Sequence, residues 1–218
     1  MAVVLHGVAP SPFVRKVRVV LLEKGIPHTL RPVTPFPPAN ATPEFRLMSP
    51  LGKVPALSDG DFAISDSSVI CMYLERSRPE TPVYPAEPRE GARALWFEEW
   101  ADTKLAETTG AVFFQRVVRP RFFQQPSDED SVRALLRDGL PPLLDYLEAQ
   151  LGGAEWLVGG RFTIADIAVG TMFQQLRYAG EPIDPARWPK LARYADRVLS
   201  RPSFAACLAD EEATLAPR

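Results

Sequence analysis

Four prolines crowd one short stretch of this chain: Pro79, Pro82, Pro85 and Pro88. Because proline has no backbone N–H and a fixed φ, neither a helix nor a strand runs easily through such a stretch, and segments of this kind often join domains. Strand signals occur before it and almost vanish after it. We therefore expect two domains, residues 1–78 and residues 89–218, joined by a proline-rich linker over residues 79–88.

Composition indicates the broad class of protein. The 218 residues leave room for one domain and a smaller neighbour, and 46% hydrophobic with 24% charged residues is typical of a globular protein with a core. A net charge of −2 offers no basic surface for nucleic acid or an anionic membrane. No apolar stretch reaches membrane-spanning length, and the short apolar run at the N-terminus precedes the first positive charges, which is the reverse of a signal peptide. These features predict a cytoplasmic protein.

The two cysteines, Cys71 and Cys207, lie far apart and form no Cys-x-x-Cys motif, so neither a disulfide framework nor a redox motif is expected. Cys71 falls on the apolar face of an expected helix, where a core thiol is typical. His6 and His28 have no cysteines or paired carboxylates at metal-ligand spacing, so we expect no metal site.

The first domain begins with alternating strand and helix signals. A β-branched run at Val3–Leu5 predicts a strand. Ser11 followed by Pro12 predicts a helix start, because serine caps helices and proline suits their first position. His28–Val33 predicts a second strand, and residues 34–50 are proline-rich and expected to form an irregular loop.

The rest of the first domain reads as a hairpin and a helix. Val54–Leu57 predicts a third strand, and Asp59-Gly60 predicts the turn that leads into a fourth strand at Phe62–Ile64. Apolar residues at helical spacing predict a helix over Ser67–Arg76. The order β-α-β followed by β-β-α indicates an α/β thioredoxin-like N-terminal domain.

Beyond the linker the pattern is helical. We expect helices over residues 90–118, 128–151, 163–179, 189–200 and 202–209. Pro141-Pro142 should break or kink the second of these. Thr163 and Asp166 have the spacing of a capping box, which predicts a structural role at a helix start. The second domain is therefore expected to be all-α.

Four short motifs occur in one order: Ser11-Pro12-Phe13-Val14-Arg15-Lys16-Val17, Lys53-Val54-Pro55-Ala56-Leu57, Asp66-Ser67 and Thr163-Ile164-Ala165-Asp166. Together they resemble the cytosolic glutathione transferase family over nearly the whole chain, and they look most like its serine-type, tau-like classes. The resemblance implies a detoxification enzyme that conjugates its co-substrate glutathione to a small apolar electrophile, with peroxide reduction as a further activity. It also implies a homodimer of N-terminal domain against helical domain, in which Asp102 either reaches the neighbour's glutathione or has a surface or intrasubunit role.

Ser11 is the candidate catalytic residue. A hydroxyl at a helix N-terminus sits in positive potential, and a hydrogen bond donated to sulfur favours the thiolate, which is the nucleophilic form of glutathione. Ser11 would act as this donor and not as a base. The alternative is a plain N-cap.

The resemblance implies a glutathione-binding set: Lys53, Val54, Pro55, Asp66 and Ser67. A cis peptide bond before Pro55 would turn the backbone of Val54 outward, where the cysteinyl unit of glutathione pairs as an added strand. Lys53 would hold the glycyl carboxylate. Ser67, as an N-cap or first-turn residue, would hold the γ-glutamyl carboxylate, and Asp66 its ammonium. The alternatives are an edge-strand proline, a surface lysine and a helix cap that needs no ligand.

Four further residues are candidates for the pocket or its support: Phe13, Arg15, Phe36 and Thr103. Arg15 lies one helical turn after Ser11, where the resemblance implies electrostatic support for the serine, and a solvated surface charge is the alternative. Phe13 is expected in the core or facing the site. Phe36 and Thr103 are expected to line an apolar electrophile pocket.

Three other functions compete with this one. A thiol transferase of the cysteine type needs a cysteine where Ser11 stands. A zeta-like isomerase is weakened by Pro12, since doubled small or polar residues are expected there. A non-catalytic glutathione-binding or regulatory module of the same fold usually loses the serine or the acidic-serine pair, and this chain keeps Ser11, Asp66 and Ser67.

Overall fold

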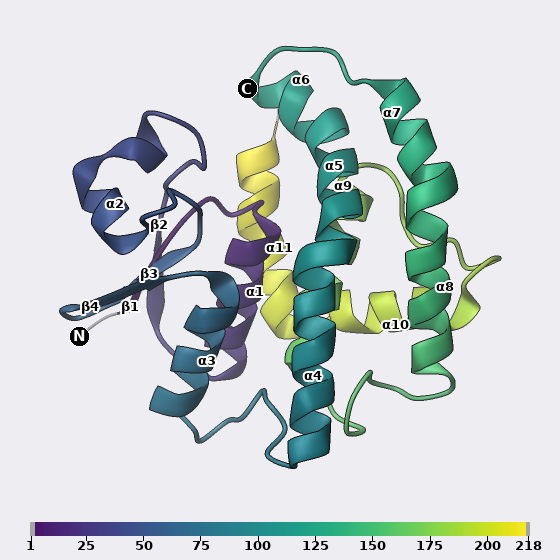
Figure 1. The fold of residues 1–218 in the computed structure, drawn as a ribbon, viewed down its shortest axis with the longest axis horizontal. Helices are drawn as coiled ribbons and strands as arrows, with labels where there is room; N and C mark the ends of the chain where they lie inside the picture. The colour runs from purple at the N-terminus through teal and green to yellow at the C-terminus, as the bar shows by residue number, and fades with distance from the viewer. Residues whose placement is uncertain (1–2, 217–218) are drawn as a thin grey trace. The chain divides into compact units, whose positions relative to one another are not determined.

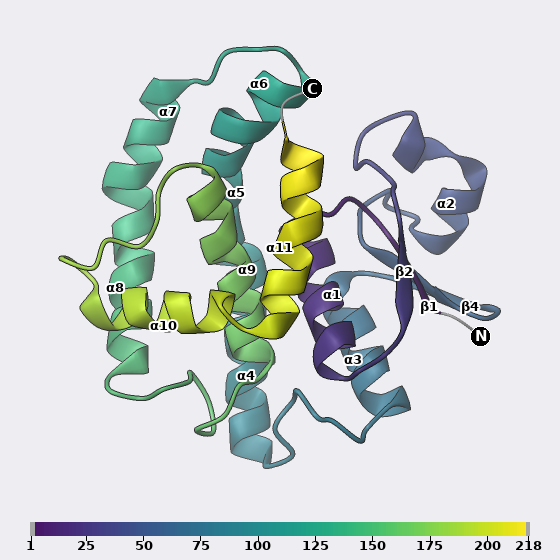
Figure 2. The same ribbon diagram turned by 180° about the vertical axis from the view of Figure 1, so that it is seen from behind.

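The computed structural model describes residues 3–216. Its contacts divide the chain into two compact units, one made of the residues up to Tyr84 together with those from Arg201 onward, and the other of Pro85–Ser200. This division differs from the expected helical domain of residues 89–218 at its C-terminal end. The last helix groups with the first unit because it packs along the first helix, as the purple and yellow segments show in Figures 1 and 2.

The first unit contains a four-stranded sheet of order β2-β1-β3-β4. The strands are β1 (Val3–His6), β2 (His28–Arg31), β3 (Ala56–Asp59) and β4 (Phe62–Ser65). β1 and β2 are parallel, and β3 is antiparallel to both β1 and β4. The predicted thioredoxin-like arrangement is confirmed.

Two strands are shorter or shifted relative to the expectation. β2 ends at Arg31 because Pro32 has no N–H for the ladder, and β3 begins at Ala56 because Pro55 has none either. Val54 and Pro55 therefore form the connection that enters β3 and do not belong to the strand itself.

The helices of the first unit are α1 (Pro12–Glu23), α2 (Pro43–Met48), α3 (Ser67–Ser77) and α11 (Pro202–Leu215), with a 3-10 turn at Ala39–Ala41. The expectation of an irregular loop over residues 34–50 was wrong in part, because the Thr42 side chain accepts a hydrogen bond from the Phe45 N–H and starts α2. α1 and α3 pack against each other and contact the sheet (Figure 1).

The second unit is helical, as expected. Its α-helices are α4 (Pro88–Trp100), α5 (Ala106–Phe113), α6 (Arg119–Phe122), α7 (Glu129–Ala134), α8 (Leu140–Leu151), α9 (Ile164–Tyr178) and α10 (Pro189–Leu199). Short π-helical segments interrupt the two long helical runs, at Ala101–Leu105, Phe114–Val118 and Leu135–Gly139. The break expected near Pro141-Pro142 is the last of these, directly before α8.

α9 forms the centre of the second unit, with every residue from Ile164 to Leu176 buried. The capping box is confirmed: the Asp166 carboxylate accepts from the backbone N–H of Thr163 at 2.8 Å. It also accepts from the Leu157 N–H and the Tyr194 hydroxyl, so it ties the start of α9 to a loop and to α10.

Among residues 3–216, no helix combines the length and the apolar character needed to cross a membrane.

Candidate functional site

One end of the sheet gathers three connections. His6 of β1 pairs with Ala56 of β3, and Ala56 pairs with Ser65 of β4. Because neighbouring strands here are antiparallel, the chain leaves β1 and β4, and enters β3, at the same end. The predicted site residues before α1, before β3 and before α3 are therefore brought together.

Gly7 lies where two of these connections meet. A Cβ at Gly7 would lie 2.4 Å from a methyl carbon of Val14 and 3.4 Å from Cβ of Val54. The first distance is too short for any side chain, so only glycine allows the end of β1 to lie against the first turn of α1.

Ser11 caps α1. Its Oγ accepts from the Val14 N–H at 3.5 Å, and its own N–H donates to the Val8 carbonyl at 3.1 Å. The side chain is half-buried. Capping uses a lone pair of the hydroxyl oxygen and leaves the hydroxyl proton free to donate. A ligand atom close to the N-terminus of α1 can therefore receive a hydrogen bond from Ser11.

Val54 and Pro55 are joined by a cis peptide bond, as the family resemblance implies. Val54 is half-buried, Pro55 is buried and Lys53 is exposed. Ser49 holds the segment from the other side, because its hydroxyl donates to the Lys53 carbonyl at 2.8 Å and accepts from the Lys53 N–H at 3.1 Å.

Asn40 is a supporting residue that sequence reasoning missed. Its buried amide donates to the carbonyls of Pro35 and Gly52, at 3.1 and 3.0 Å. The loop over residues 34–55 is therefore cross-linked upon itself just before Val54. An asparagine in a proline-rich loop is a weak signal, since asparagine is common in turns without such a role.

Asp66 begins α3 in a backbone conformation that is unusual for a residue other than glycine, with φ at 82°. Its carboxylate accepts from the N–H groups of Ser68 and Val69, at 3.0 and 3.2 Å. Ser67 therefore occupies the first turn and not the N-cap, one of the two places expected for it. Asp66 is exposed, whereas Ser67 is 5% exposed.

α1 and α3 run in the same direction. The Lys16 amine donates to the Ser68 hydroxyl at 3.0 Å, and the Lys24 amine to Glu75 at 2.8 Å, so advancing along one helix advances along the other. Their N-termini therefore lie at the same end of the first unit. Because each N-terminus carries a partial positive charge, this end suits anions such as a thiolate and a carboxylate.

Arg15 is fully buried and bonded to Glu211 of α11, with Nε donating to Oε1 at 2.7 Å and Nη2 to Oε2. The alternative of a solvated surface charge was therefore wrong. Arg15 fastens the first turns of α1 to the last helix of the chain. The acidic partner was missed by sequence reasoning because it lies 196 residues away.

The other three candidates for the pocket or its support have ordinary surroundings. Phe13 is half-buried, and Phe36 is 37% exposed. Thr103 belongs to the second unit, where it is exposed and its hydroxyl donates to the Glu99 carbonyl at 2.6 Å. Asp102 precedes it in the same π-helical segment.

The residues that suggest other chemistry are buried. Both cysteines are thiols outside any disulfide and are fully buried, and burial raises the pKa of the Cys207 thiol to about 11. His6 lies within the sheet, 3.2 Å from the Ser58 hydroxyl, and burial together with Arg31 lowers its pKa. Over residues 3–216, no group of three or more His, Cys, Asp or Glu side chains is arranged to hold a metal ion.

Comparison with known families matches two parts of the chain. Residues 5–82 match the model of the glutathione S-transferase N-terminal domain, and residues 129–197 match that of the C-terminal domain. The glutathione S-transferase theta-3 of Mus musculus is 31% identical over 84% of this chain and 76% of its own length. The chain belongs to the glutathione S-transferase family.

Two further relatives show the range of this family. A solved glutathione S-transferase of Methylobacterium radiotolerans, in complex with glutathione sulfonate, is 33% identical with a TM-score of 0.75, over 95% of this chain and 94% of the other. The FtsZ-localized protein A of Caulobacter vibrioides is 26% identical over 98% of this chain and 93% of its own length. Glutathione S-transferases and a protein named for its localisation are thus both similar to this chain. The tau-like subclass stays a prediction.

Proposed function

We propose that this glutathione S-transferase family member is an active transferase, in which Ser11 holds the thiol of glutathione as a thiolate that attacks an apolar electrophile. The observation that carries the proposal is the position of Ser11. It caps α1 through its oxygen, keeps a proton to donate, and stands at the sheet end where Val54 and Asp66 also lie.

Ser11 and the N-terminus of α1 can supply the free energy needed to lower the pKa of the glutathione thiol. A free thiol of pKa ~8.5 is mostly protonated near neutrality, and lowering its pKa by about two units needs roughly 2.7 kcal/mol of differential stabilisation. A hydrogen bond to a charged acceptor contributes about 1.5–3 kcal/mol, and a helix N-terminus about 0.3–1 kcal/mol. Ser11 together with α1 supplies both.

The remaining parts of glutathione have matching groups in the first unit. The outward N–H and C=O of Val54 pair with the cysteinyl unit as an added strand. Pro55 sets the direction of that backbone through the cis bond. The exposed Lys53 binds the glycyl carboxylate, and the exposed Asp66 binds the γ-glutamyl ammonium. Ser67 and the start of α3 receive the γ-glutamyl carboxylate.

The electrophile is a small apolar molecule, and Phe13 and Phe36 are the apolar side chains of the first unit that would contact it. Conjugation is the main reaction of this proposal, and peroxide reduction uses the same thiolate.

The protein acts in the cytoplasm as a homodimer. Leu47 and Leu51 support the dimer, because they are 87% and 77% exposed and large apolar side chains in such positions often belong to interfaces.

A second candidate function is a glutathione-binding or regulatory module without catalysis. The similarity to FtsZ-localized protein A covers nearly the full length of both chains and supports the module as the second candidate. Retention of Ser11 as the N-cap of α1 favours the enzyme.

The two candidates are separated by conjugation of glutathione to a generic aryl halide. We expect activity in the natural protein and a loss of about 100-fold in kcat/KM for Ser11→Ala, the factor that about 2.7 kcal/mol represents. Asp128→Ala is the matched control, because Asp128 caps α7 through the Ser131 N–H at 3.1 Å and lies in the other unit. Glutathione binding without conjugation would favour the module, and full activity in Ser11→Ala would refute the role of Ser11.

A further inference from the structure

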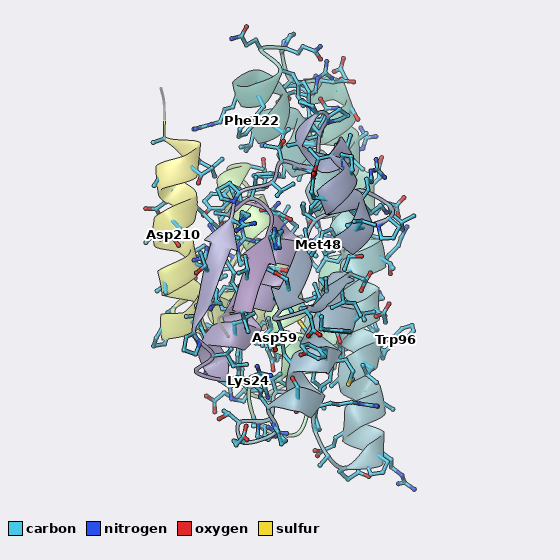
Figure 3. All side chains as sticks on the ribbon, turned by 90° about the vertical axis from the view of Figure 1, so that its left-hand side faces the viewer. Lys24, Met48, Asp59, Trp96, Phe122 and Asp210 are labelled. Atoms are coloured by element: carbon cyan, nitrogen blue, oxygen red, sulfur yellow. The ribbon has the colours of Figure 1, made fainter. Side chains whose placement is uncertain are left out.

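Ser49 is a small buried residue whose N–H, C=O and hydroxyl all form hydrogen bonds. It directly follows Met48, the last residue of α2 and labelled in Figure 3, and it is 1% exposed. Its N–H donates to the Phe45 carbonyl at 2.8 Å, and its carbonyl accepts from the Gly52 N–H at 2.8 Å. Its hydroxyl forms two further bonds, both to Lys53. A buried hydroxyl that is bonded in this way fixes the geometry of the groups around it.

The two bonds of the hydroxyl hold a single backbone residue. The Ser49 Oγ donates to the Lys53 carbonyl at 2.8 Å and accepts from the Lys53 N–H at 3.1 Å. In an antiparallel sheet, a hydrogen-bonded pair of residues exchanges the same kinds of bond. Ser49 therefore does for Lys53 what a neighbouring strand would do, although β3 begins only at Ala56.

This contact determines which way the next residue faces. Successive residues of an extended chain direct their backbone N–H and C=O groups to opposite sides. Val54 precedes Pro55, and the residue before a proline favours an extended conformation. Because the groups of Lys53 are turned towards Ser49, those of Val54 are turned away from it. They face the side on which a peptide ligand pairs as an added strand.

Two neighbouring contacts support Ser49 in this position. The Thr42 hydroxyl caps α2, and α2 packs against β3 and β4. The Asn40 amide donates to the Gly52 carbonyl at 3.0 Å and so braces the turn between Ser49 and Lys53. The backbone of Lys53 is thus attached, through Ser49, to a helix that is itself packed on the sheet.

We propose that Ser49 is a positioning residue for the cysteinyl unit of glutathione: its hydroxyl holds Lys53 so that Val54 presents its N–H and C=O to the ligand. This inference rests on the proposed binding of glutathione in the first unit and names a residue that makes that binding possible. Ser49 does not contact the ligand, and it acts through the backbone of the two residues that do.

The test compares two ligands by calorimetric titration of the full chain. One ligand is glutathione, and the other is its analogue with an ester oxygen in place of the cysteinyl N–H, which cannot donate to the Val54 carbonyl. The measured quantity is the ratio of the two dissociation constants, analogue over glutathione. Ser49→Ala removes the positioning hydroxyl. Thr42→Ala is the matched control, because it removes a hydroxyl of the same segment whose bond goes to the Phe45 N–H.

We expect the natural protein to bind the analogue about tenfold more weakly than glutathione, because one hydrogen bond is lost. In Ser49→Ala we expect glutathione to bind about tenfold more weakly and the ratio to fall towards one, since the two changes remove the same interaction. Thr42→Ala should keep the ratio near ten. A ratio that stays near ten in Ser49→Ala, or one that falls equally in both variants, would overturn the inference.

The remaining outcomes are separable. If Ser49→Ala does not fold, Ser49→Cys takes its place, because a thiol is a weak donor and a weak acceptor, and the ratio is interpreted in the same way. If the natural protein fails to bind glutathione at millimolar concentration, the proposed function falls and this inference falls with it. If the natural protein binds both ligands equally well, this inference is overturned and the proposed role of Ser11 stands.

Discussion

Ser11 divides its hydroxyl between two tasks. The oxygen accepts from the Val14 N–H, which satisfies one donor of the first turn of α1, and the proton remains for a thiolate. Lys16, one turn further along α1, is buried and its amine donates to the Ser68 hydroxyl in the first turn of α3. At this scale the proposed catalysis needs no unusual chemistry, only helix-terminal groups that have a second function.

The cysteines give a prediction at the residue scale. Cys71 and Cys207 are both fully buried, which shields both sulfur atoms from a reagent, and burial also raises the pKa of the Cys207 thiol to about 11. We expect neither to react rapidly with an aromatic disulfide reagent in the folded protein and both to react after unfolding in guanidinium. A thiol that reacts rapidly in the folded state would contradict this and would revive a cysteine-based activity.

Local residue patterns predicted the two helix starts of the candidate site. Ser11 before Pro12, and Asp66 before Ser67, are helix starts that are visible within a few residues. Lys16 and Asn40 were out of reach, because their partners depend on how distant segments meet: Ser68 lies 52 residues from Lys16, and Gly52 lies 12 residues from Asn40.

At the scale of elements, α1 is held by α11 along its whole length. Glu23 at the end of α1 accepts from Arg201 and Ser203, at the start of α11, and Arg15 near its beginning pairs with Glu211. The two helices are therefore antiparallel. The expected helix over residues 202–209 extends to Leu215, and its buried acid is what carries the contact to the first turns of α1.

Removal of that acid should destabilise the protein strongly. Glu211→Gln leaves the Arg15 charge buried without its carboxylate, and we expect a loss of about 3–5 kcal/mol in the free energy of unfolding. Glu107→Gln is the matched control, since Glu107 pairs with Lys104 at the surface. We expect this substitution to lower the free energy of unfolding by less than about 1 kcal/mol. Urea denaturation measures both, and equal effects would refute the structural role of the buried pair.

The second unit supplies a prediction about pH. Hydrogen bonds from Arg116 and Ser127 lower the pKa of Glu129 below its ordinary value of 4.5. Because the folded pKa lies below the unfolded one, this carboxylate stabilises the fold above about pH 4.5, and the contribution disappears as pH falls through the lowered value.

We therefore expect Arg116→Met to lower the thermal midpoint near neutrality, and the gap to the natural protein to narrow on acidification below about pH 4.5. Thermal unfolding followed by circular dichroism at a series of pH values measures this. A gap that stays constant down to acidic pH would show that Arg116 stabilises by packing or by its bond to the Ala179 carbonyl alone.

At the scale of the whole molecule, the chain joins a thioredoxin-like unit to a helical one, and this division into fold classes was predictable from the proline-rich stretch. The return of the last helix to the first unit was not, because a helix at the C-terminus has the same local pattern whichever unit it covers. The sequence pattern did not predict the π-helical segments either, because they change the hydrogen bonding of a helix and not its apolar spacing.

The proposed homodimer belongs to this scale. We expect the natural protein to sediment as a dimer at micromolar concentration, and the double variant Leu47→Glu with Leu51→Glu to sediment as a monomer. Phe122→Glu is the control, because Phe122 is an apolar residue of the second unit that is 52% exposed (Figure 3). A monomeric natural protein would contradict the dimer, and an unchanged dimer in the double variant would place its interface elsewhere.

The central claim is that Ser11 stabilises the thiolate of bound glutathione. The most direct measurement is the pKa of that thiol, followed by the ultraviolet absorbance of the thiolate in the natural protein and in Ser11→Ala, both saturated with glutathione. We expect a pKa about two units below the ordinary ~8.5 in the natural protein, and a return most of the way to that value in the variant. A bound thiol that titrates at the same pH in both proteins would contradict the account.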